Sequence, residues 1–382
     1  MTRILYFTRE YTTHDRRFLS AIVGAGYQVF YMQLEQRGHI LEERKLPAGV
    51  ERLDWAGGKL PYRTEEQHRL VADLERVIQE VQPDLIQAGP MHLSAYLAAR
   101  TGFQPLLSMS WGYDLLYEAQ RCVESQKAIR YTLQHSAAMV GDCDTIRKLA
   151  ITHGMADERI VTFPWGVDLM HFSPQIDAGQ ERQAQAISAD PASPFTLLST
   201  RGWEPIYGVD ILAEGFAQAA RERPELRLVM LGNGSQGPEL RQIFRRAGVL
   251  ERVSFPGQVG YADLPAYYQG ADLYVSASHS DGTSISLLEA LACGTPVLVS
   301  DIPGNREWIT PGVEGWWFPD GDAEALCQMI LQVVELRRRL PEIGRSARQL
   351  AERRADWDQN YPLLFQAYHI ALAGKNKLDR LA

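Results

Sequence analysis

Short runs of apolar residues alternate along the chain with longer stretches in which apolar positions recur every three to four residues. The first pattern is typical of buried strands and the second of amphipathic helices. In the first part of the chain, the strands predicted in this way are residues 3–8, 28–33, 84–88, 105–110, 138–140 and 160–163. The helices predicted between them are residues 15–23, 64–81, 93–101, 116–135 and 144–153. Alternating strands and helices indicate β-α-β units and a parallel sheet.

A polar segment rich in Gln, Ala and Asp, residues 173–193, interrupts this pattern and is flanked by prolines. After this segment, apolar runs again alternate with amphipathic stretches. Strands are predicted at residues 195–200, 227–231, 252–255, 272–276 and 296–299. The tail from Ala323 onward is mostly helical in its pattern. A chain of 382 residues is long enough for two domains. We therefore predict an inter-domain region at residues 173–193 and an α/β domain on each side of it.

The composition is that of an ordinary globular protein, with 45% hydrophobic and 23% charged residues. This excludes collagen-like, low-complexity and disordered chains. The formal net charge of -8 makes the chain a poor candidate for nucleic-acid binding, which needs a dense cationic surface. None of the four cysteines forms a C-x-x-C pair, so neither a zinc ribbon nor a thioredoxin-type centre is indicated.

The sequence predicts a cytoplasmic protein. Scattered cysteines suit a reducing compartment. Arg3, Arg9 and Glu10 interrupt any apolar segment that could serve as a signal peptide. No stretch approaches the roughly 20 apolar residues that a membrane helix needs. Peripheral contact with the inner face of a membrane stays open, and the oligomeric state is not predicted.

The segment of residues 278–299 carries the clearest chemistry. A strand runs into a loop of small polar residues, and a helix follows from about Ser284. Gly282, Thr283 and Ser284 place backbone N–H groups at the positive end of this helix, which is a ready anion site. Gly294 stands where a helix commonly ends in a left-handed residue.

Two carboxylates, Asp281 and Glu289, flank this anion site. Carboxylate oxygens accept hydrogen bonds from sugar hydroxyls, so the segment could hold a sugar, a diphosphate and a ribose. In the plainer alternative, Asp281 is only a helix-start residue and Glu289 an exposed helix residue.

The same segment resembles the E-x7-E signature of the retaining glycosyltransferases of family 4, which have the GT-B fold. Asp281 takes the place of the first Glu, and Glu289 opens the run EALACGTPV. Four further segments resemble motifs of that family in the same order, namely residues 160–168 (IVTFPWGVD), 228–234 (LVMLGNG), 253–259 (VSFPGQV) and 304–322 (GNREWITPGVEGWWFPDGD).

This resemblance implies an α/β protein of the GT-B class, in which two Rossmann-like, doubly wound parallel-sheet domains face a central cleft. Residues 1–172 would bind the acceptor, and residues 173–355 would bind a nucleotide-diphosphate sugar. A C-terminal helix of about residues 356–382 would pack back on the first domain.

The resemblance also assigns roles to residues. Glu289 would bind the ribose hydroxyls of the donor, and Asp281 would face the hydroxyls of the donor sugar. The backbone of Gly282, Thr283 and Ser284 would cap the sugar and the diphosphate. The segment Gly257, Gln258 and Val259 would lie against the nucleobase.

The chain departs from the family where an Arg and a Lys are usual, after the first strand of the second domain. Arg201 matches the Arg, which stabilises the charge of the leaving diphosphate. The position of the Lys falls on Ile206 or Tyr207, and the register of the following Gly-Val-Asp favours Tyr207. A tyrosine hydroxyl can donate to a phosphate oxygen but brings no charge.

The first domain departs further. The loop of residues 10–17 stands where relatives have a Gly-Gly loop, and His14 and Asp15 are its candidates for acceptor contact or sugar positioning. Alternatively, Asp15 only caps the helix that follows. Trp111 stands where relatives often have a His near the reacting centre, and Asp114 follows it as a second candidate cleft residue.

The D-x-D strings at residues 142–144, 320–322 and 356–358 have plainer roles in turns and helix starts, so we expect no metal site and no cofactor.

The sequence therefore predicts a metal-independent retaining glycosyltransferase. It would move a hexose from a nucleotide-diphosphate sugar to a hydroxyl of a glycan, a lipid-linked or a small-molecule acceptor. Two alternatives stay open: a catalytically weak protein that binds nucleotide sugars or acts as a scaffold, and a GT-B epimerase of nucleotide sugars. The sequence leaves the base, the sugar and the acceptor undetermined.

Overall fold

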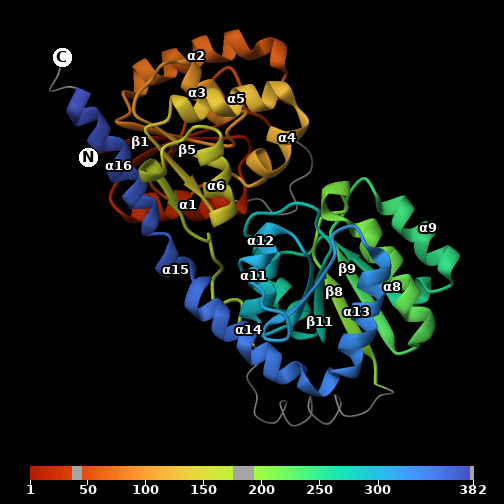
Figure 1. Cartoon of the computed structure of the whole chain (residues 1–382). Coiled ribbons are helices and arrows are strands. Elements are labelled where there is room, and N and C mark those ends of the chain that lie inside the picture. The colour runs from red at the N-terminus through yellow and green to blue at the C-terminus, as the bar shows by residue number, and fades with distance from the viewer. Residues whose placement is uncertain (37–44, 175–192, 379–382) are drawn as a thin grey trace. The chain divides into compact units, whose positions relative to one another are not determined.

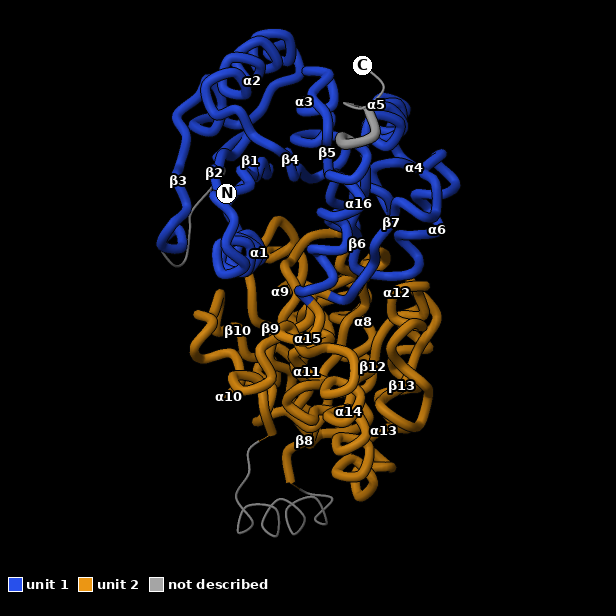
Figure 2. The backbone as a smooth tube through the Cα atoms, turned by 90° about the vertical axis from the view of Figure 1, so that its left-hand side faces the viewer, with its two compact units in different colours: residues 1–164, 361–382 blue, residues 165–360 orange. Residues whose placement is uncertain are grey.

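The computed structural model describes residues 1–36, 45–174 and 193–378 (Figure 1). The chain divides into two compact units, coloured separately in Figure 2. Unit 1 consists of Met1–Pro164 and Tyr361–Ala382, and unit 2 of Trp165–Asn360. The predicted inter-domain segment, residues 173–193, falls almost entirely outside the described residues.

Unit 1 contains, in its described residues, a seven-stranded parallel sheet in the order β3-β2-β1-β4-β5-β6-β7. Its strands are β1 (Arg3–Thr8), β2 (Gln28–Gln33), β3 (Val50–Arg52), β4 (Leu85–Ala88), β5 (Leu106–Met109), β6 (Ala138–Gly141) and β7 (Ile160–Thr162). Its helices are α1 (Thr13–Gly24), α2 (Gln67–Val81), α3 (Ser94–Arg100), α4 (Ala119–Arg121), α5 (Val123–Gln134), α6 (Asp144–Thr152) and α16 (Leu363–Leu378). The central strands are mostly apolar because both faces of a parallel sheet are covered; Ile4, Leu5, Tyr6 and Phe7 of β1 are all fully buried.

The last helix, α16, packs against strands β4 to β7 of unit 1. The Tyr368 hydroxyl donates to Gln87 Oε1 at 2.6 Å, and the ring of Tyr27 stacks on that of Phe365 at 5.7 Å. Trp357 stays in unit 2, where its backbone N–H donates to the carbonyl of Val167. The segment from Tyr361 onward therefore completes unit 1.

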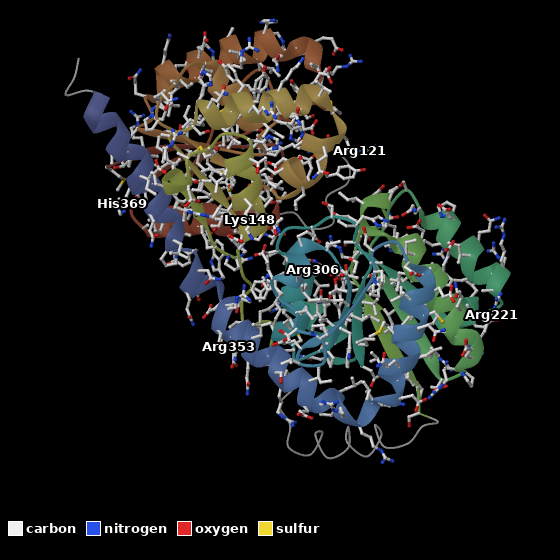
Figure 3. The ribbon with its side chains drawn as sticks, viewed as in Figure 1. Arg121, Lys148, Arg221, Arg306, Arg353 and His369 are labelled. Atoms are coloured by element: carbon white, nitrogen blue, oxygen red, sulfur yellow. The ribbon has the colours of Figure 1, made fainter. Side chains whose placement is uncertain are left out.

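Unit 2 contains, in its described residues, a six-stranded parallel sheet in the order β10-β9-β8-β11-β12-β13. Its strands are β8 (Phe195–Ser199), β9 (Leu226–Leu231), β10 (Val253–Gly257), β11 (Leu273–Ser276), β12 (Val297–Ser300) and β13 (Gly315–Phe318). Its helices are α8 (Val209–Glu222), α9 (Gly237–Ala247), α10 (Leu264–Gln269), α11 (Ile285–Ala292), α12 (Pro303–Arg306), α13 (Ala323–Glu335), α14 (Leu340–Arg354) and α15 (Trp357–Asn360). Charged side chains such as Arg221 and Arg353 lie on the surface of this unit (Figure 3).

Unit 2 begins eight residues earlier than the sequence pattern placed its domain, at Trp165 instead of residue 173. The reason is packing. Val167 and Phe172 are buried in the core of unit 2, and the N–H of Val167 donates to the carbonyl of Ala355 at 2.7 Å.

In both units the first strand lies inside the sheet. The next two strands in sequence lie on one side of it, and the later strands lie on the other side. The direction changes between β1 and β4 in unit 1, and between β8 and β11 in unit 2. The predicted α/β class with two doubly wound parallel sheets is thus confirmed. Ligands of such sheets bind outside the carboxyl ends of the strands at this change of direction.

Candidate functional site

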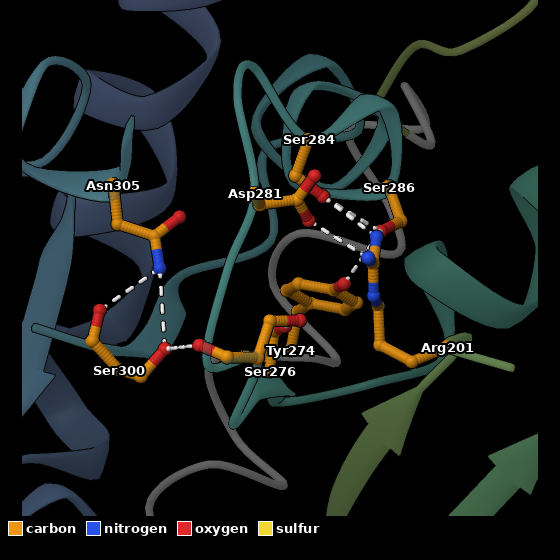
Figure 4. Close-up of polar contacts among 9 residues, drawn as sticks. Arg201, Tyr274, Ser276, Asp281, Ser284, Ser286, Ser300 and Asn305 are labelled. Atoms are coloured by element: carbon orange, nitrogen blue, oxygen red, sulfur yellow. Dashed lines mark hydrogen bonds and ion pairs between the residues drawn. The ribbon is translucent and has the colours of Figure 1, made fainter. Parts of the chain in front are cut away.

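Arg201 lies at the change of direction in unit 2, two residues after the end of β8. Its side chain reaches the loop and helix that follow the neighbouring strand, β11 (Figure 4). Nη2 contacts Asp281 Oδ2 at 2.7 Å, and Nη1 donates to Ser284 Oγ at 2.9 Å and to Ser286 Oγ at 3.0 Å. The fold therefore brings together three residues singled out in the sequence, and it adds Ser286. We call these four residues the Arg201 cluster.

The ion pair in this cluster is largely withdrawn from water, with side-chain exposures of 11% for Arg201 and 21% for Asp281. Burial disfavours the charged form of Arg201, but Asp281 and Tyr274 outweigh this effect and raise the pKa of the guanidinium. Burial also raises the pKa of Asp281, although Arg201 opposes that shift. The site thus holds a permanent cation that is mostly shielded from solvent screening.

Helix α11 presents its positive end to this cation. Ser284 is the residue that precedes the helix, yet its side chain makes no capping bond to the first turn and instead accepts from Arg201. The other end of α11 is anchored by Arg348 of α14, which donates to the carbonyl of Ala292 at 2.7 Å. The turn before the helix packs closely on Gly304, where a Cβ would lie 2.3 Å from the carbonyl oxygen of Gly282. Glycine at position 304 is therefore required for the turn to take this place.

Glu289 is buried inside α11, which rules out the alternative that it is an exposed helix residue. Its Oε2 accepts from the Tyr268 hydroxyl at 2.7 Å, and that hydroxyl lies 2.9 Å from Thr200 Oγ1. Burial raises the pKa of Tyr268 well above its ordinary value, so the hydroxyl stays protonated and can donate. Glu289 is thereby linked through Tyr268 to Thr200, the residue before Arg201.

The other residues predicted to contact the donor are Tyr207 and the segment 257–259. The ring of Tyr207 lies against the Arg201 guanidinium, with 4.1 Å between Cζ and the ring centroid. Gly257 ends β10 with a left-handed φ of 87°, and its carbonyl accepts from the N–H of Gly232. Gln258 is exposed, whereas Val259 packs against the core. These three residues lie at the end of a strand two positions away from β8, outside the Arg201 cluster.

In unit 1, Asp15 belongs to the start of helix α1. Thr12 is the capping residue, and Asp15 Oδ2 accepts from its N–H at 2.7 Å and from its hydroxyl at 2.6 Å. Oδ1 accepts from the Tyr6 hydroxyl at 3.0 Å. Asp15 is fully buried, and this burial raises its pKa from the ordinary value of 3.8 to about 6. Its contacts are those of a helix start, as in the alternative drawn from the sequence.

The raised pKa of Asp15 has a measurable consequence for stability. The folded state binds the proton of Asp15 more tightly than the unfolded state, so the stabilising effect is complete below pH 3.8 and is lost as the pH rises through about 6. We expect Asp15→Asn, which lacks this titration, to gain stability relative to wild type by up to about 3 kcal/mol between pH 4 and pH 7.5. Apparent melting temperatures of both proteins across this range measure the effect. If the melting temperatures of the two proteins changed with pH in parallel, the raised pKa of Asp15 would be contradicted.

Trp111 and Asp114 both follow β5. The ring of Trp111 lies 5.9 Å from that of His14, so these two candidates do meet. Asp114 is fully buried and accepts from the hydroxyl of Ser110 at 2.6 Å and from the N–H of Met91 at 2.9 Å. Its carboxylate therefore joins the loops that follow β4 and β5.

Sequence reasoning did not single out a buried arginine–carboxylate pair of unit 1, Arg9 and Glu35. Arg9 directly follows β1, and its Nε donates to Glu35 Oε1 at 2.5 Å. Glu35 is fully buried and also accepts from the N–H of Tyr62, while Arg9 Nη1 donates to the Tyr113 hydroxyl at 3.2 Å. His92, after β4, meets the ring of Tyr113 edge-on. The available signal was the position of Arg9, which follows the first strand of its sheet as Arg201 does.

Three residues of the D-x-D strings have partners in the protein. Asp144 pairs with Lys148 at 2.6 Å, Asp320 with His279 at 2.7 Å, and Asp322 accepts from the N–H of Ala325 at the start of α13. Across residues 1–36, 45–174 and 193–378, no group of three or more His, Cys, Asp and Glu side chains is arranged to hold a metal ion. In the same residues, no helix combines the length and the apolar character needed to cross a membrane.

A family model matches part of unit 2, and solved structures resemble nearly the whole chain. Residues 180–350 match the family "Glycosyl transferases group 1". The sucrose-phosphate synthase of Thermosynechococcus elongatus has the same fold, with a TM-score of 0.78 and 20% identity over 98% of this chain and 100% of that one. HepE of Anabaena, solved in complex with UDP-glucose, gives a TM-score of 0.73 and 19% identity over 98% and 100% of the two chains.

The fold is GT-B. A D-inositol 3-phosphate glycosyltransferase of Segniliparus rotundus is 30% identical over 222 residues, which cover 57% of this chain. The chain spans only 48% of that relative's length. Together with the family match, which covers most of unit 2, these similarities support a GT-B glycosyltransferase family.

Proposed function

We propose that the chain is a glycosyltransferase, which moves a hexosyl group from a nucleotide-diphosphate sugar to a hydroxyl acceptor. The observation that carries this proposal is the Arg201 cluster at the positive end of α11. A shielded guanidinium and a helix N-terminus lie together where a doubly wound sheet binds its ligand. The match of residues 180–350 to group 1 glycosyl transferases supports the same activity.

The cluster suits departure of a diphosphate. When the bond between the anomeric carbon and the bridging oxygen breaks, negative charge grows on the diphosphate. Arg201 and the dipole of α11 would stabilise that charge in the transition state more than in the bound substrate. Because these groups supply positive charge themselves, we propose that transfer needs neither a metal ion nor a cofactor. Asp281 would accept from hydroxyls of the donor sugar, and Glu289 from those of the ribose.

Retention of the anomeric configuration is part of the proposal, and it rests on the D-x7-E string formed by Asp281 and Glu289. The proton NMR spectrum of the first product formed tests it directly. An α-linked donor should give an α-linked product, and an inverted product would remove this part of the proposal.

The first test is thermal stabilisation by nucleotide sugars. A ligand that binds only the folded state at 100 times its Kd stabilises the protein by about 2.7 kcal/mol. The panel begins with UDP-glucose, the ligand solved with HepE, and extends to other UDP-, GDP- and ADP-sugars. We expect one sugar nucleotide to raise the melting temperature in the presence of EDTA. A flat response across the panel would contradict donor binding.

Release of nucleoside diphosphate on adding an acceptor then tests transfer. The acceptor panel includes inositol 3-phosphate, taken from the name of the Segniliparus relative, as well as simple glycosides. Tyr207, which brings no charge to the site, is the feature that favours the alternative of a weak binding protein. Donor binding without any product would support that alternative, and conversion of the donor's sugar without acceptor would support the epimerase.

A further inference from the structure

Tyr207 is held in place by its backbone, independently of Arg201. It ends a short 3-10 turn, Pro205–Tyr207, and the next residue, Gly208, is left-handed with a φ of 54°. A Cβ at Gly208 would lie 2.1 Å from the carbonyl oxygen of Ala277, so only glycine lets the turn pack against the end of β11. The N–H of His279 also donates to the carbonyl of Ile206 at 3.0 Å. The backbone of Tyr207, which carries the ring, is therefore fixed beside the loop that follows β11.

The ring of Tyr207 covers one face of the Arg201 guanidinium, 4.1 Å from Cζ. Gly202 lies beside the edge of the ring, where an added Cβ would be in ordinary van der Waals contact at 3.4 Å. The π-face of an aromatic ring attracts a cation, and the attraction is stronger where water is excluded. The contact with Arg201 is made by the ring of Tyr207 and not by its hydroxyl.

The remaining contacts of Arg201 leave its Nε–H donor unused. Nη1 and Nη2 are held by Ser284, Ser286 and Asp281, whereas Nε is buried and has no hydrogen-bond acceptor within the described part of the chain. Buried donors without an acceptor are uncommon in folded proteins. An anionic ligand oxygen would satisfy this one with a charge-assisted bond.

We propose that Tyr207 is a positioning residue for the transfer reaction, and that its ring, not its hydroxyl, fixes the orientation of the Arg201 guanidinium toward the leaving diphosphate. This inference rests on the proposed function. The role of the ring is to orient the guanidinium, because the orientation of a guanidinium decides which of its N–H groups contact the ligand. Charge alone does not set this orientation.

The test compares two substitutions at position 207, with the nucleotide sugar that gives the largest thermal stabilisation of the wild type as substrate. Tyr207→Phe keeps the ring, and we expect it to retain most of the wild-type turnover. Tyr207→Leu removes the ring, and we expect kcat to fall about 10- to 30-fold, the equivalent of a shielded cation–π contact, with a smaller change in KM. Tyr207→Met serves as a second ring-free variant if the Leu variant does not fold.

Tyr267→Leu is the matched control, because Tyr267 is a half-buried tyrosine of α10 in the same unit and packs against a different core cluster. We expect its turnover to stay at the wild-type level. A loss in Tyr207→Phe as large as that in Tyr207→Leu would assign the role to the hydroxyl and overturn the inference.

A double-mutant cycle shows whether the ring acts through Arg201. In an Arg201→Gln background, Tyr207→Leu should lower the residual turnover less than twofold, because no cation remains for the ring to orient. An equal loss in both backgrounds would overturn the inference and leave the proposed function intact. Failure of the wild type to cleave any nucleotide sugar would instead overturn the proposed function, so the two failures are distinguishable.

Discussion

Arg201→Gln is expected to lower the turnover of nucleotide-sugar cleavage by about 10²–10³-fold, the effect typical of removing one preorganised charge-stabilising group from an active site. The substitution removes the buried cation of the Arg201 cluster but keeps a side chain that can still donate to Ser284 or Ser286. The effect should fall on kcat, because the charge on the diphosphate is greatest in the transition state. Initial rates of nucleoside diphosphate release, measured over a range of donor concentrations, separate kcat from KM. Arg245→Ala, on the exposed face of α9, is the control.

A loss of activity in Arg201→Gln could also arise from instability, because Asp281 would lose its partner. Removing one member of a buried ion pair typically costs about 3–5 kcal/mol, and the partial exposure of this pair reduces that cost. The double variant Arg201→Gln/Asp281→Asn removes both charges and separates the two explanations. It should recover stability and remain inactive. Recovery of turnover in the double variant would show that Arg201 only neutralises Asp281.

The sequence pattern predicted the central strands because each is a short and mostly apolar run. It missed β3, where Glu51 and Arg52 are exposed at the edge of the sheet and no apolar run exists. It also missed β13, a four-residue strand that begins with Gly315 and is followed by Pro319. The single helix predicted at residues 116–135 is wrong. The chain breaks at Cys122, which is extended between α4 and α5.

The beginning of the same segment also departs from a regular helix. It opens with a π-helical turn, Asp114–Glu118. Asp114, the first residue of this turn, accepts from the N–H of Met91, which lies 23 residues earlier in the chain. Helix propensity is a local quantity and cannot reveal such a contact between distant loops.

In the candidate site, too, the sequence indicated some residues, whereas others are recognised only from contacts that form on folding. Arg201, Asp281 and Glu289 were predicted because they lie in strings that resemble a known family. Tyr268 was missed because it meets Glu289 only after α10 and α11 have packed together, 21 residues apart in sequence. For Asp15 the sequence left two roles open, ligand contact and helix capping. Its partners in the structure are Thr12 and Tyr6, and the position of a polar residue after a strand cannot distinguish the two roles.

Glu289→Gln is expected to lower kcat/KM for the donor by about 10²-fold, because two hydrogen bonds from the ribose to a charged acceptor, each contributing about 1.5–3 kcal/mol, would be weakened. Most of the loss should appear in KM, since the ribose lies away from the bond that breaks. Gln can still accept from the Tyr268 hydroxyl, so the contact inside unit 2 is largely preserved.

The decisive measurement uses a ligand that lacks the groups in question. Calorimetry compares the nucleoside diphosphate of the donor with its 2′,3′-dideoxy analogue, for the wild type and for Glu289→Gln. The wild type should prefer the ribonucleotide by 10-fold or more, on the order of one charge-assisted hydrogen bond, and the variant should lose that preference. Tyr268→Phe leaves the carboxylate and removes only its internal donor, so it should keep the preference. An unchanged preference in Glu289→Gln, together with a lower melting temperature, would show that this carboxylate serves the packing of α11 and not the ligand.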